Sequence, residues 1–317
     1  MSLSRRQRDV VEGYGFLLPN ILGFAMFVLL PVGMSLVLSL CEWDLFGKPL
    51  FVGLKNFRIL LYEFHPERYK ALSGLDALGF WNYMGDRYFW QFLGNTLFFM
   101  LMIPASMAVS LALAVTMNRK LRGIVVFRTI YFLPVISSMV ACAILWRWIY
   151  NPEYGLLNGV LAGLSIPRDS LPQWLNSTAW AKPAIMLMLI WKGAGYNMLL
   201  YLAGLQGIPP SLYEAAEVDG ANSWNQFWHV TFPMLGHVNL FIVIMSVIGG
   251  LQMFGEIFVM TGGGPGGSTT TLVYYIYQNA FVWNRMGMAA SLSWILFVMI
   301  FTVTAVQWRY LGKRAAI

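Results

Sequence analysis

The fold of this chain follows from one uncharged stretch, FWQFLGNTLFFMLMIPASMAVSLALAVTM, which runs from Phe89 to Met117 without an acidic or basic side chain. A helix needs about 20 consecutive apolar residues to cross the hydrocarbon core of a bilayer, and this stretch is longer. Composition extends the argument, because 58% of the 317 residues are hydrophobic and 11% are charged. Soluble domains have roughly 45–50% and about 25%. The sequence therefore predicts a membrane protein.

Five further apolar blocks carry at most two charged residues each. They are Phe16–Leu40, Phe127–Tyr150, Pro183–Leu205, Val238–Met260 and Ala289–Trp308. Helices satisfy their own backbone groups inside a membrane, and the short alternating strands of a barrel are missing from the sequence. We expect an all-α polytopic protein with six transmembrane helices. We divide it into residues 1–88, which hold the N-terminus, the first span and an extracytoplasmic segment (58–88) of unknown role, and a five-helix core at 89–317.

Basic residues mark one side of this membrane protein. They lie near both ends of the chain and in the short loop after the second span, and positively charged loops face the cytoplasm. These residues are Arg5, Arg6, Arg8, Arg119, Lys120, Arg122, Arg309, Lys313 and Arg314. Six crossings then place both termini in the cytoplasm. The loop at 206–237 should also be cytoplasmic, yet it holds Glu214, Glu217 and Asp219 and no Lys or Arg.

The sequence of this acidic loop predicts two short helices joined by a glycine. Ser211–Glu214 and Ser223–Gln226 both fit the capping box, in which a Ser begins a helix and a Glu or Gln three residues later bonds back to it. Gly220 offers a left-handed exit from the first helix, and Pro233 is expected to end the second. A compact acidic element of this kind indicates a docking partner with a basic groove.

The stretch YEAAEVDGA at Tyr213–Ala221, followed by Phe227 and then Thr231–Pro233, resembles the EAA loop of binding-protein-dependent ABC importer permeases. Phe232 stands where Leu commonly precedes the proline. Four other segments resemble the maltose- and glycerol-3-phosphate-type permeases, so that the resemblance runs from about Phe16 onward. These segments are Phe51–Phe57, Phe127–Pro134, Trp146–Gly155 and Met260–Pro265.

The resemblance implies a transport assembly in a bacterial or archaeal plasma membrane. Its expected partners are membrane lipid, a second homologous permease, two ATPase subunits that bind ATP and Mg, and an extracytoplasmic solute-binding protein; nucleic acid is not among them. The residues that it assigns to coupling with the ATPase are Glu214, Ala215, Ala216, Asp219, Gly220 and Pro233. We expect no cofactor in this chain and no enzymatic activity, because the glycine-rich run Gly262–Thr269 lacks the lysine of a phosphate-binding loop. We read that run as a flexible outer loop.

Candidate residues of a translocation path are polar or aromatic side chains within the fourth and fifth spans. They are Lys192, Tyr196, Asn197, Gln252, Phe254 and Glu256. Lys192 lies about nine residues, or roughly 14 Å, inside its span, where a charge should face a cavity or a partner. An ion pair with Glu256, or snorkelling of either side chain, competes with a place in the path. The scattered histidines form no metal or catalytic set.

The solute is expected to be a sugar, because aromatic side chains are plentiful and arginine clamps for an anion are not. Glycerol-3-phosphate or a related organic phosphate is the alternative within the same importer class. An ion-coupled secondary transporter would need ionisable relays near the midplane, for which Lys192 and Glu256 are thin support. A membrane-embedded transferase would need a carboxylate or histidine cluster, and no paired spacing indicates one.

Overall fold

The computed structural model describes residues 5–62, 87–119, 122–167 and 170–315. The chain divides into two compact units, Met1–Asp86 with Ile276–Ile295, and Arg87–Tyr275 with Leu296–Ile317. The predicted division after residue 88 stays a prediction. Most of the segment 58–88, whose role we left open, lies outside the described residues.

The first unit begins with one long helical stretch, formed by α1 (Arg5–Phe24), a π turn η1 (Ala25–Leu29) and α2 (Leu30–Ser39). The π turn ends at Leu29, two residues before Pro31. Pro31 has no backbone N–H to donate, so the regular pattern of helical hydrogen bonds is already interrupted at this point. The stretch keeps its direction through both prolines and gives one candidate span, Glu12–Ser39.

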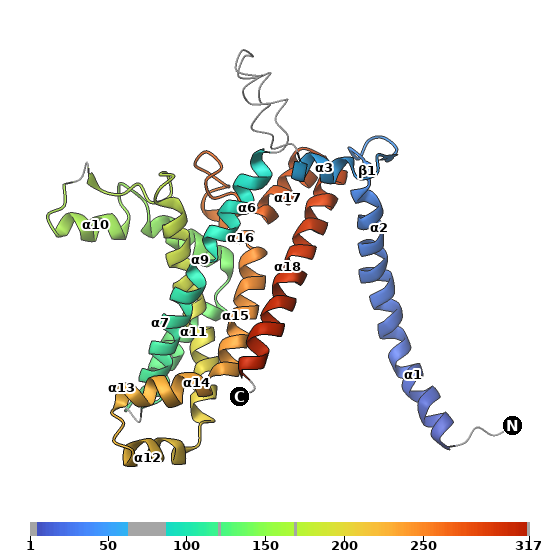
Figure 1. Cartoon of the computed structure of the whole chain (residues 1–317). Coiled ribbons are helices and arrows are strands. Elements are labelled where there is room, and N and C mark those ends of the chain that lie inside the picture. The colour runs from blue at the N-terminus through green and yellow to red at the C-terminus, as the bar shows by residue number, and fades with distance from the viewer. Residues whose placement is uncertain (1–4, 63–86, 120–121, 168–169, 316–317) are drawn as a thin grey trace. The chain divides into compact units, whose positions relative to one another are not determined.

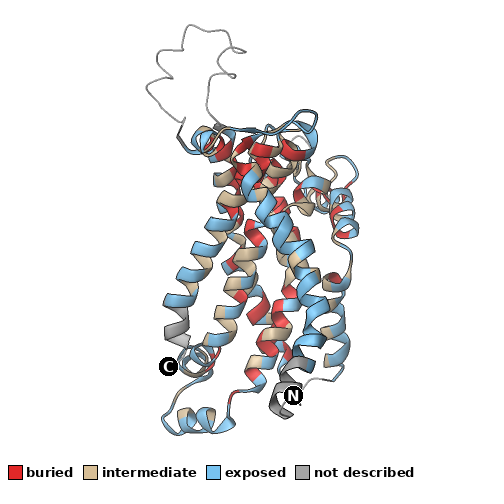
Figure 2. Ribbon diagram, turned by 90° about the vertical axis from the view of Figure 1, so that its right-hand side faces the viewer, coloured by how far each residue is buried: buried red, intermediate tan, exposed pale blue. Residues whose placement is uncertain are grey.

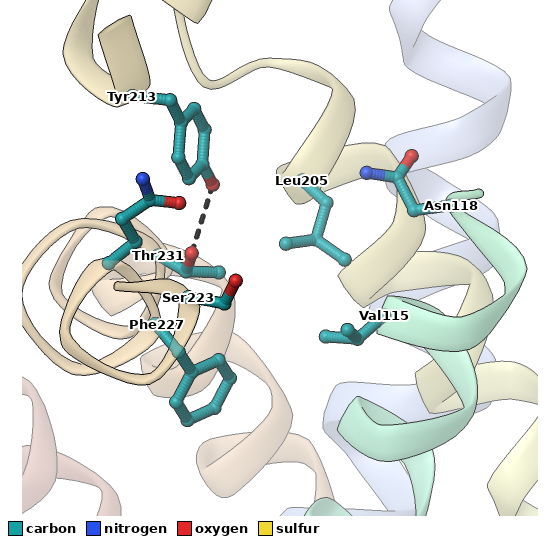
Figure 3. Close-up of a pocket in the computed structure, with 8 residues that line it drawn as sticks. Val115, Asn118, Leu205, Tyr213, Ser223, Phe227 and Thr231 are labelled. Carbon is teal, nitrogen blue, oxygen red and sulfur yellow. Dashed lines mark hydrogen bonds between the residues drawn. The ribbon is translucent and has the colours of Figure 1, made fainter. Parts of the chain in front are cut away.

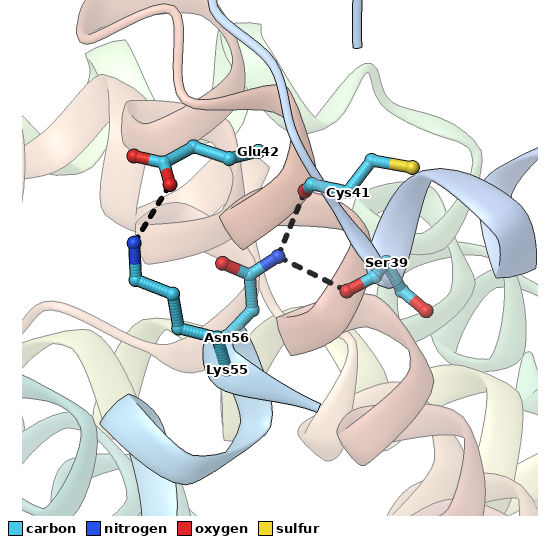
Figure 4. Close-up of polar contacts among 5 residues, drawn as sticks. All are labelled: Ser39, Cys41, Glu42, Lys55 and Asn56. Carbon is cyan, nitrogen blue, oxygen red and sulfur yellow. Dashed lines mark hydrogen bonds and ion pairs between the residues drawn. The ribbon is translucent and has the colours of Figure 1, made fainter. Parts of the chain in front are cut away.

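A small polar corner follows α2 (Figure 4). Strands β1 (Cys41–Glu42) and β2 (Leu50–Phe51) pair in antiparallel fashion, and α3 (Lys55–Tyr62) follows them. The buried Asn56 amide donates to the carbonyls of Ser39 and Cys41 at 3.0 and 2.9 Å, which ties α3 to the end of α2. Lys55 pairs with Glu42 at 2.8 Å on an exposed surface, where an ion pair contributes little to stability.

The second unit contains most of the helices. Their bounds are α6 (Arg87–Phe99), α7 (Met102–Met117), α8 (Ile124–Ile136), α9 (Met139–Ile149), α10 (Leu156–Gly163), α11 (Ala181–Gln206), α12 (Pro210–Val218), α13 (Ser223–Gln226), η3 (Phe227–Thr231), α14 (Phe232–Met234), α15 (Gly236–Leu251) and α16 (Gly255–Met260). Then follow α17 (Leu272–Tyr277), η4 (Gln278–Val282) and α18 (Met286–Ala315). The boundaries between the units fall within α17 and within α18, so η4 belongs to the first unit. Within the described part of the chain, four helices are long and apolar enough to cross a membrane, or up to six if each bent pair is one span. The predicted all-α membrane fold is confirmed.

Two predicted spans are not continuous helices. In the third, α8 and α9 meet at an angle of 100°. Pro134 removes a helical hydrogen bond shortly before the bend, and Ser137 and Ser138 take extended backbone angles. The fifth predicted span, Val238–Met260, stops at Leu251, and α16 begins only after an irregular turn.

The core of the second unit forms where α11 packs on α7 and α15. Its buried members include Leu111, Ala114, Met198, Tyr201, Leu202, Leu205, Leu235 and Ile242. A Cβ on Gly204 would lie 2.8 Å from the side chains of Leu235 and Val238, so α11 and α15 approach closely because this residue is a glycine. The Tyr201 hydroxyl donates to Asn239 Oδ1 across the same contact at 2.7 Å. Figure 2 shows long exposed faces on the span helices, as expected of helices that meet lipid or other subunits.

Candidate functional site

The loop between α11 and α15 holds the predicted coupling residues. Helix α12 ends at Val218, and Gly220 supplies the predicted left-handed exit with a φ of +79°. The Gly220 amide donates to the Glu217 carbonyl at 3.0 Å, and the Ala221 amide donates to the Ala216 carbonyl at 2.9 Å. These two bonds form a Schellman motif, which satisfies the last carbonyls of the helix. The end of α12 therefore has a defined shape.

Both predicted capping boxes are wrong. Helix α12 begins at Pro210 with Pro209 as its N-cap and no side-chain cap, because proline is well suited to the first helical position and Ser211 already lies inside the helix. Helix α13 is capped by Asn222, whose Oδ1 accepts from the Asn225 amide at 2.9 Å. Asn caps a helix as well as Ser does, so the start moved by one residue. Pro233 lies within α14, and the chain bends directly after that helix.

The base of the loop is fixed to the core of the second unit (Figure 3). The Tyr213 hydroxyl and the Thr231 Oγ1 lie 3.0 Å apart and join α12 to η3. Tyr213 and Phe227 pack against the buried cluster around Leu205 and Leu235. Beside them is a cavity of about 240 Å³, which is lined by Val115, Asn118, Leu205, Tyr213, Ser223, Gln226, Phe227 and Thr231.

The outer part of the loop is exposed. The side chains of Glu214, Glu217 and Asp219 all reach the surface, as do Ala215 and Gly220, while Ala216 is half-buried. The structure thus combines an anchored base with an acidic, accessible helix. Pro233 is exposed too, but it belongs to the second helical segment, away from the acids in sequence.

The structure places Lys192 at the bend of the third span. Its ammonium donates to the carbonyls of Pro134 and Ser137 at 3.0 and 2.9 Å, at the C-terminal end of α8. A cation there meets carbonyls that lack helical partners and the negative end of the helix dipole. Glu256 interacts electrostatically with Lys192 from α16. Lys192 therefore has a structural role at this bend: besides the interaction with Glu256 that the sequence suggested, it binds two carbonyls at the end of α8 that the sequence did not indicate.

The other candidate path residues differ in how far they are exposed. Tyr196 is exposed on α11, whereas its neighbour Asn197 is buried. Gln252 is exposed and forms the C-cap of α15, because the helix ends before the predicted span does. Phe254 is half-buried and stacks on Phe258 and Tyr274, with ring centroids 5.4 and 6.1 Å apart.

The glycine-rich segment that begins at Gly262 is more tightly bonded than the flexible loop we expected. Three successive buried threonines donate to backbone carbonyls: Thr269 to Gly264 at 2.7 Å, Thr270 to Gly263 at 3.0 Å, and Thr271 to Met253 at 2.7 Å. The segment is also tied to α6, because the Asn95 amide donates to the carbonyls of Gly267 and Thr270 at 2.9 Å each. The sequence signal for this network was Asn95 itself, one of the few polar side chains in an uncharged run.

Comparison with known proteins connects these features to a family. The model of the family described as "binding-protein-dependent transport system inner membrane component" matches residues 106–315. The lactose transport system permease protein LacF of Rhizobium radiobacter is 38% identical over 94% of this chain and 93% of its own length. The arabinooligosaccharides transport system permease protein AraP of Bacillus subtilis is 33% identical over 95% of this chain and 88% of its own length.

Two further matches agree. The sn-glycerol-3-phosphate transport system permease protein UgpA of Agrobacterium fabrum is 33% identical over 95% of this chain and 94% of its own length. A chain in the crystal structure of a bacterial ABC transporter involved in the import of the acidic polysaccharide alginate has the same fold, with a TM-score of 0.74, 21% identity, and coverage of 98% of this chain and 99% of that chain. This chain therefore belongs to the family of binding-protein-dependent transport system inner membrane components and is a permease subunit of an ABC importer.

Proposed function

We propose that the chain forms, together with a second homologous permease, the translocation path for a neutral sugar delivered by an extracytoplasmic binding protein. Relatives named for lactose and arabinooligosaccharides support the sugar assignment. The chain is then a transport scaffold with no reaction of its own, as its relatives, named as transport system permease proteins, suggest. The binding and hydrolysis of ATP with Mg belong to two partner ATPase subunits.

The coupling loop is the observation that carries this proposal. A helix that is acidic and exposed on the outside, and fixed at its base by Tyr213, suits transmission of a partner's movement to the spans. Glu214, Glu217 and Asp219 would meet basic side chains of the ATPase, since opposite charges steer association and fix register. Ala215 and Ala216 are small enough for close approach, and Gly220 and Pro233 shape the backbone on either side.

A neutral solute suits the charges better than an organic phosphate does. Lys192 is occupied by two carbonyls, and Arg147 donates to the Val259 carbonyl at 3.2 Å. Both cations already bind backbone carbonyls, and a phosphate would have to compete with these carbonyls for them. Glycerol-3-phosphate remains the second candidate because a relative is named for it. Tyr196, Asn197, Gln252 and Phe254 are our proposed contacts for the sugar.

The proposed orientation places both termini and the coupling loop in the cytoplasm of a bacterial or archaeal cell. The basic loop around Arg119 and Arg122 would face the same side. The glycine-rich segment tied to Asn95 would then face the binding protein.

The test of function is uptake into proteoliposomes that hold the assembled transporter and its binding protein. We expect vanadate-sensitive, ATP-dependent uptake of a mono- or oligosaccharide. Stimulation by glycerol phosphates alone would overturn the sugar assignment and leave the importer class intact. Uptake driven by a proton or sodium gradient without ATP would overturn the coupling proposal.

A variant pair tests the loop. Gly220→Val forces a β-branched side chain into a left-handed turn, and Gly123→Val imposes the same strain at φ +78° in another loop. Neither added Cβ meets a neighbour within 4 Å, so backbone strain is matched in the two variants. We expect only Gly220→Val to weaken ATPase association at normal membrane levels. Wild-type transport by Gly220→Val would contradict the coupling role.

A further inference from the structure

A row of aromatic side chains lies exposed on the second helical segment of the coupling loop. Trp224, Trp228 and Phe232, which we call the aromatic stripe, follow one another four residues apart and are 67%, 45% and 40% exposed. Their rings touch in sequence, with centroids 5.7 Å apart between the two tryptophans and 5.3 Å apart between Trp228 and Phe232. A row of large exposed aromatics indicates an interaction surface.

The direction of this segment is set by the bend that follows it. The segment Ser223–Met234, which we call the stripe helix, makes an angle of 64° with α15 (Figure 1). Spans tilt on average by about 20° from the bilayer normal. A helix at 64° to such a span makes an angle of about 44–84° with the normal, and over nearly all of this range it lies closer to the membrane plane than to the normal. Its other face is held by the core, where Thr231 and Leu235 are buried.

Charge separates the stripe helix from α12. Helix α12 and its exit hold Glu214, Glu217 and Asp219, which suit a basic protein groove. From Ala221 to Gly255 the chain has no Asp, Glu, Lys or Arg. The stripe helix thus continues the uncharged character of the span that follows it, although its residues reach the surface.

Exposed apolar side chains continue from the stripe helix along α15. Met234, Phe241 and Met245 are each about half exposed. Phe241 and Met245 lie four residues apart and so share one face of α15, whereas Met234 is the last residue of the stripe helix, before the bend. Exposed apolar side chains thus lie on both sides of the bend, on the stripe helix and on the span that follows it.

We propose that the aromatic stripe is seated in the interfacial layer of the bilayer, among lipid headgroups and the upper acyl chains, on the side where the loop emerges. Indole rings suit this layer because the ring is apolar and its N–H can bond to water or headgroups. The loop then has two partners: lipid for the stripe helix and protein for α12. This inference rests on the membrane family of the chain and is independent of the solute.

Spin-label accessibility in lipid bilayers tests the proposal on the assembled transporter. A nitroxide attached through Trp228→Cys should be relaxed more strongly by lipid-soluble oxygen than by a water-soluble nickel chelate. Phe301→Cys on α18 is the control for the membrane interior, and Phe46→Cys in the loop after β1 is the control for water; both side chains are exposed. The two native cysteines are buried and are replaced by alanine in all variants.

Two results would overturn the proposal. Relaxation mainly by the nickel chelate would place the stripe in water, and protection from both reagents would mean that protein covers it. Tryptophan fluorescence gives a readout without cysteines. The emission of Trp224 and Trp228 is obtained as the difference between the wild type and the variant with Trp224→Phe and Trp228→Phe. This emission should be quenched more by lipids brominated near the glycerol backbone than by lipids brominated near the chain ends. If neither brominated lipid quenched this emission, the result would also count against a place at the interface. A failed uptake assay would leave both measurements unaffected.

Discussion

Removal of the Lys192 ammonium should loosen the bend between α8 and α9. Lys192→Met keeps the length and the apolar stem of the side chain and removes both bonds to the Pro134 and Ser137 carbonyls. Hydrogen bonds to charged groups are worth about 1.5–3 kcal/mol in soluble proteins, and interhelical bonds in membranes average about 0.6 with a maximum near 1.7 kcal/mol. We therefore expect a loss of about 1–3 kcal/mol. A loss of this size lowers the melting temperature by a few degrees, since roughly 2–4 °C correspond to each kcal/mol in domains of about 150–250 residues and somewhat less in longer chains.

The reporter for this change is Cys142, which is buried one turn beyond the bend. Its thiol should react faster with a membrane-permeant maleimide in Lys192→Met, while buried Cys41, in the other unit, serves as the internal reference. Lys192→Arg keeps a cation and should react at nearly the wild-type rate. Lys182 lies near the start of α11, the helix that also carries Lys192, and its ammonium is 4.8 Å from the centre of the Phe98 ring. Lys182→Met therefore controls for the loss of a cation from the same helix.

The reasoning is refuted if Lys192→Met melts at the wild-type temperature and its Cys142 reacts at the wild-type rate. A raised KM for uptake together with unchanged Cys142 reactivity would instead mean that Lys192 contacts the solute.

Three further predictions concern single contacts. Gly195→Ala should destabilise the transporter by about 1–3 kcal/mol through overpacking, because the added Cβ would overlap the Tyr131 carbonyl; the yield and the melting temperature of purified transporter should both fall. Gly193→Ala, whose added Cβ would lie 4.0 Å from Ser106 Oγ, should behave as wild type. Tyr213→Phe should lower solute-stimulated ATPase activity at normal membrane levels, since it frees α12 from Thr231; unchanged stimulation would speak against this link. Gly220→Asn should keep the ATPase association that Gly220→Val loses, as measured by co-purification, because Asn tolerates left-handed angles.

The sequence was a reliable guide wherever one local rule decided the structure. Uncharged length located the spans, and Gly220 was recognised because a left-handed exit after a short helix favours glycine. The helix starts were missed by one or two residues, since Pro210 and Asn222 competed with equally plausible serines.

The remaining errors arose from contacts between distant residues. Prolines are common inside membrane spans, so Pro134 alone did not reveal a bend of 100°. The bend is completed by Lys192, which lies more than fifty residues further along the chain. In the same way, Thr270 and Asn95 are adjacent only in the folded chain, and nothing in the local pattern of either segment pairs them.

The Schellman closure of α12 has a mechanical consequence. A nine-residue helix is a stiff rod of about 14 Å, fixed near Pro210 and free at its Gly220 end. A partner that displaces the free end by about 1 Å turns such a rod by about 4°, given the 1.5 Å rise per residue that sets its length. If the loop couples the permease to an ATPase as proposed, the link from Tyr213 to Thr231 would transfer this rotation to the segment leading into α15. The loop would then act as a short lever, and the number of residues between Pro210 and Gly220 would set its length.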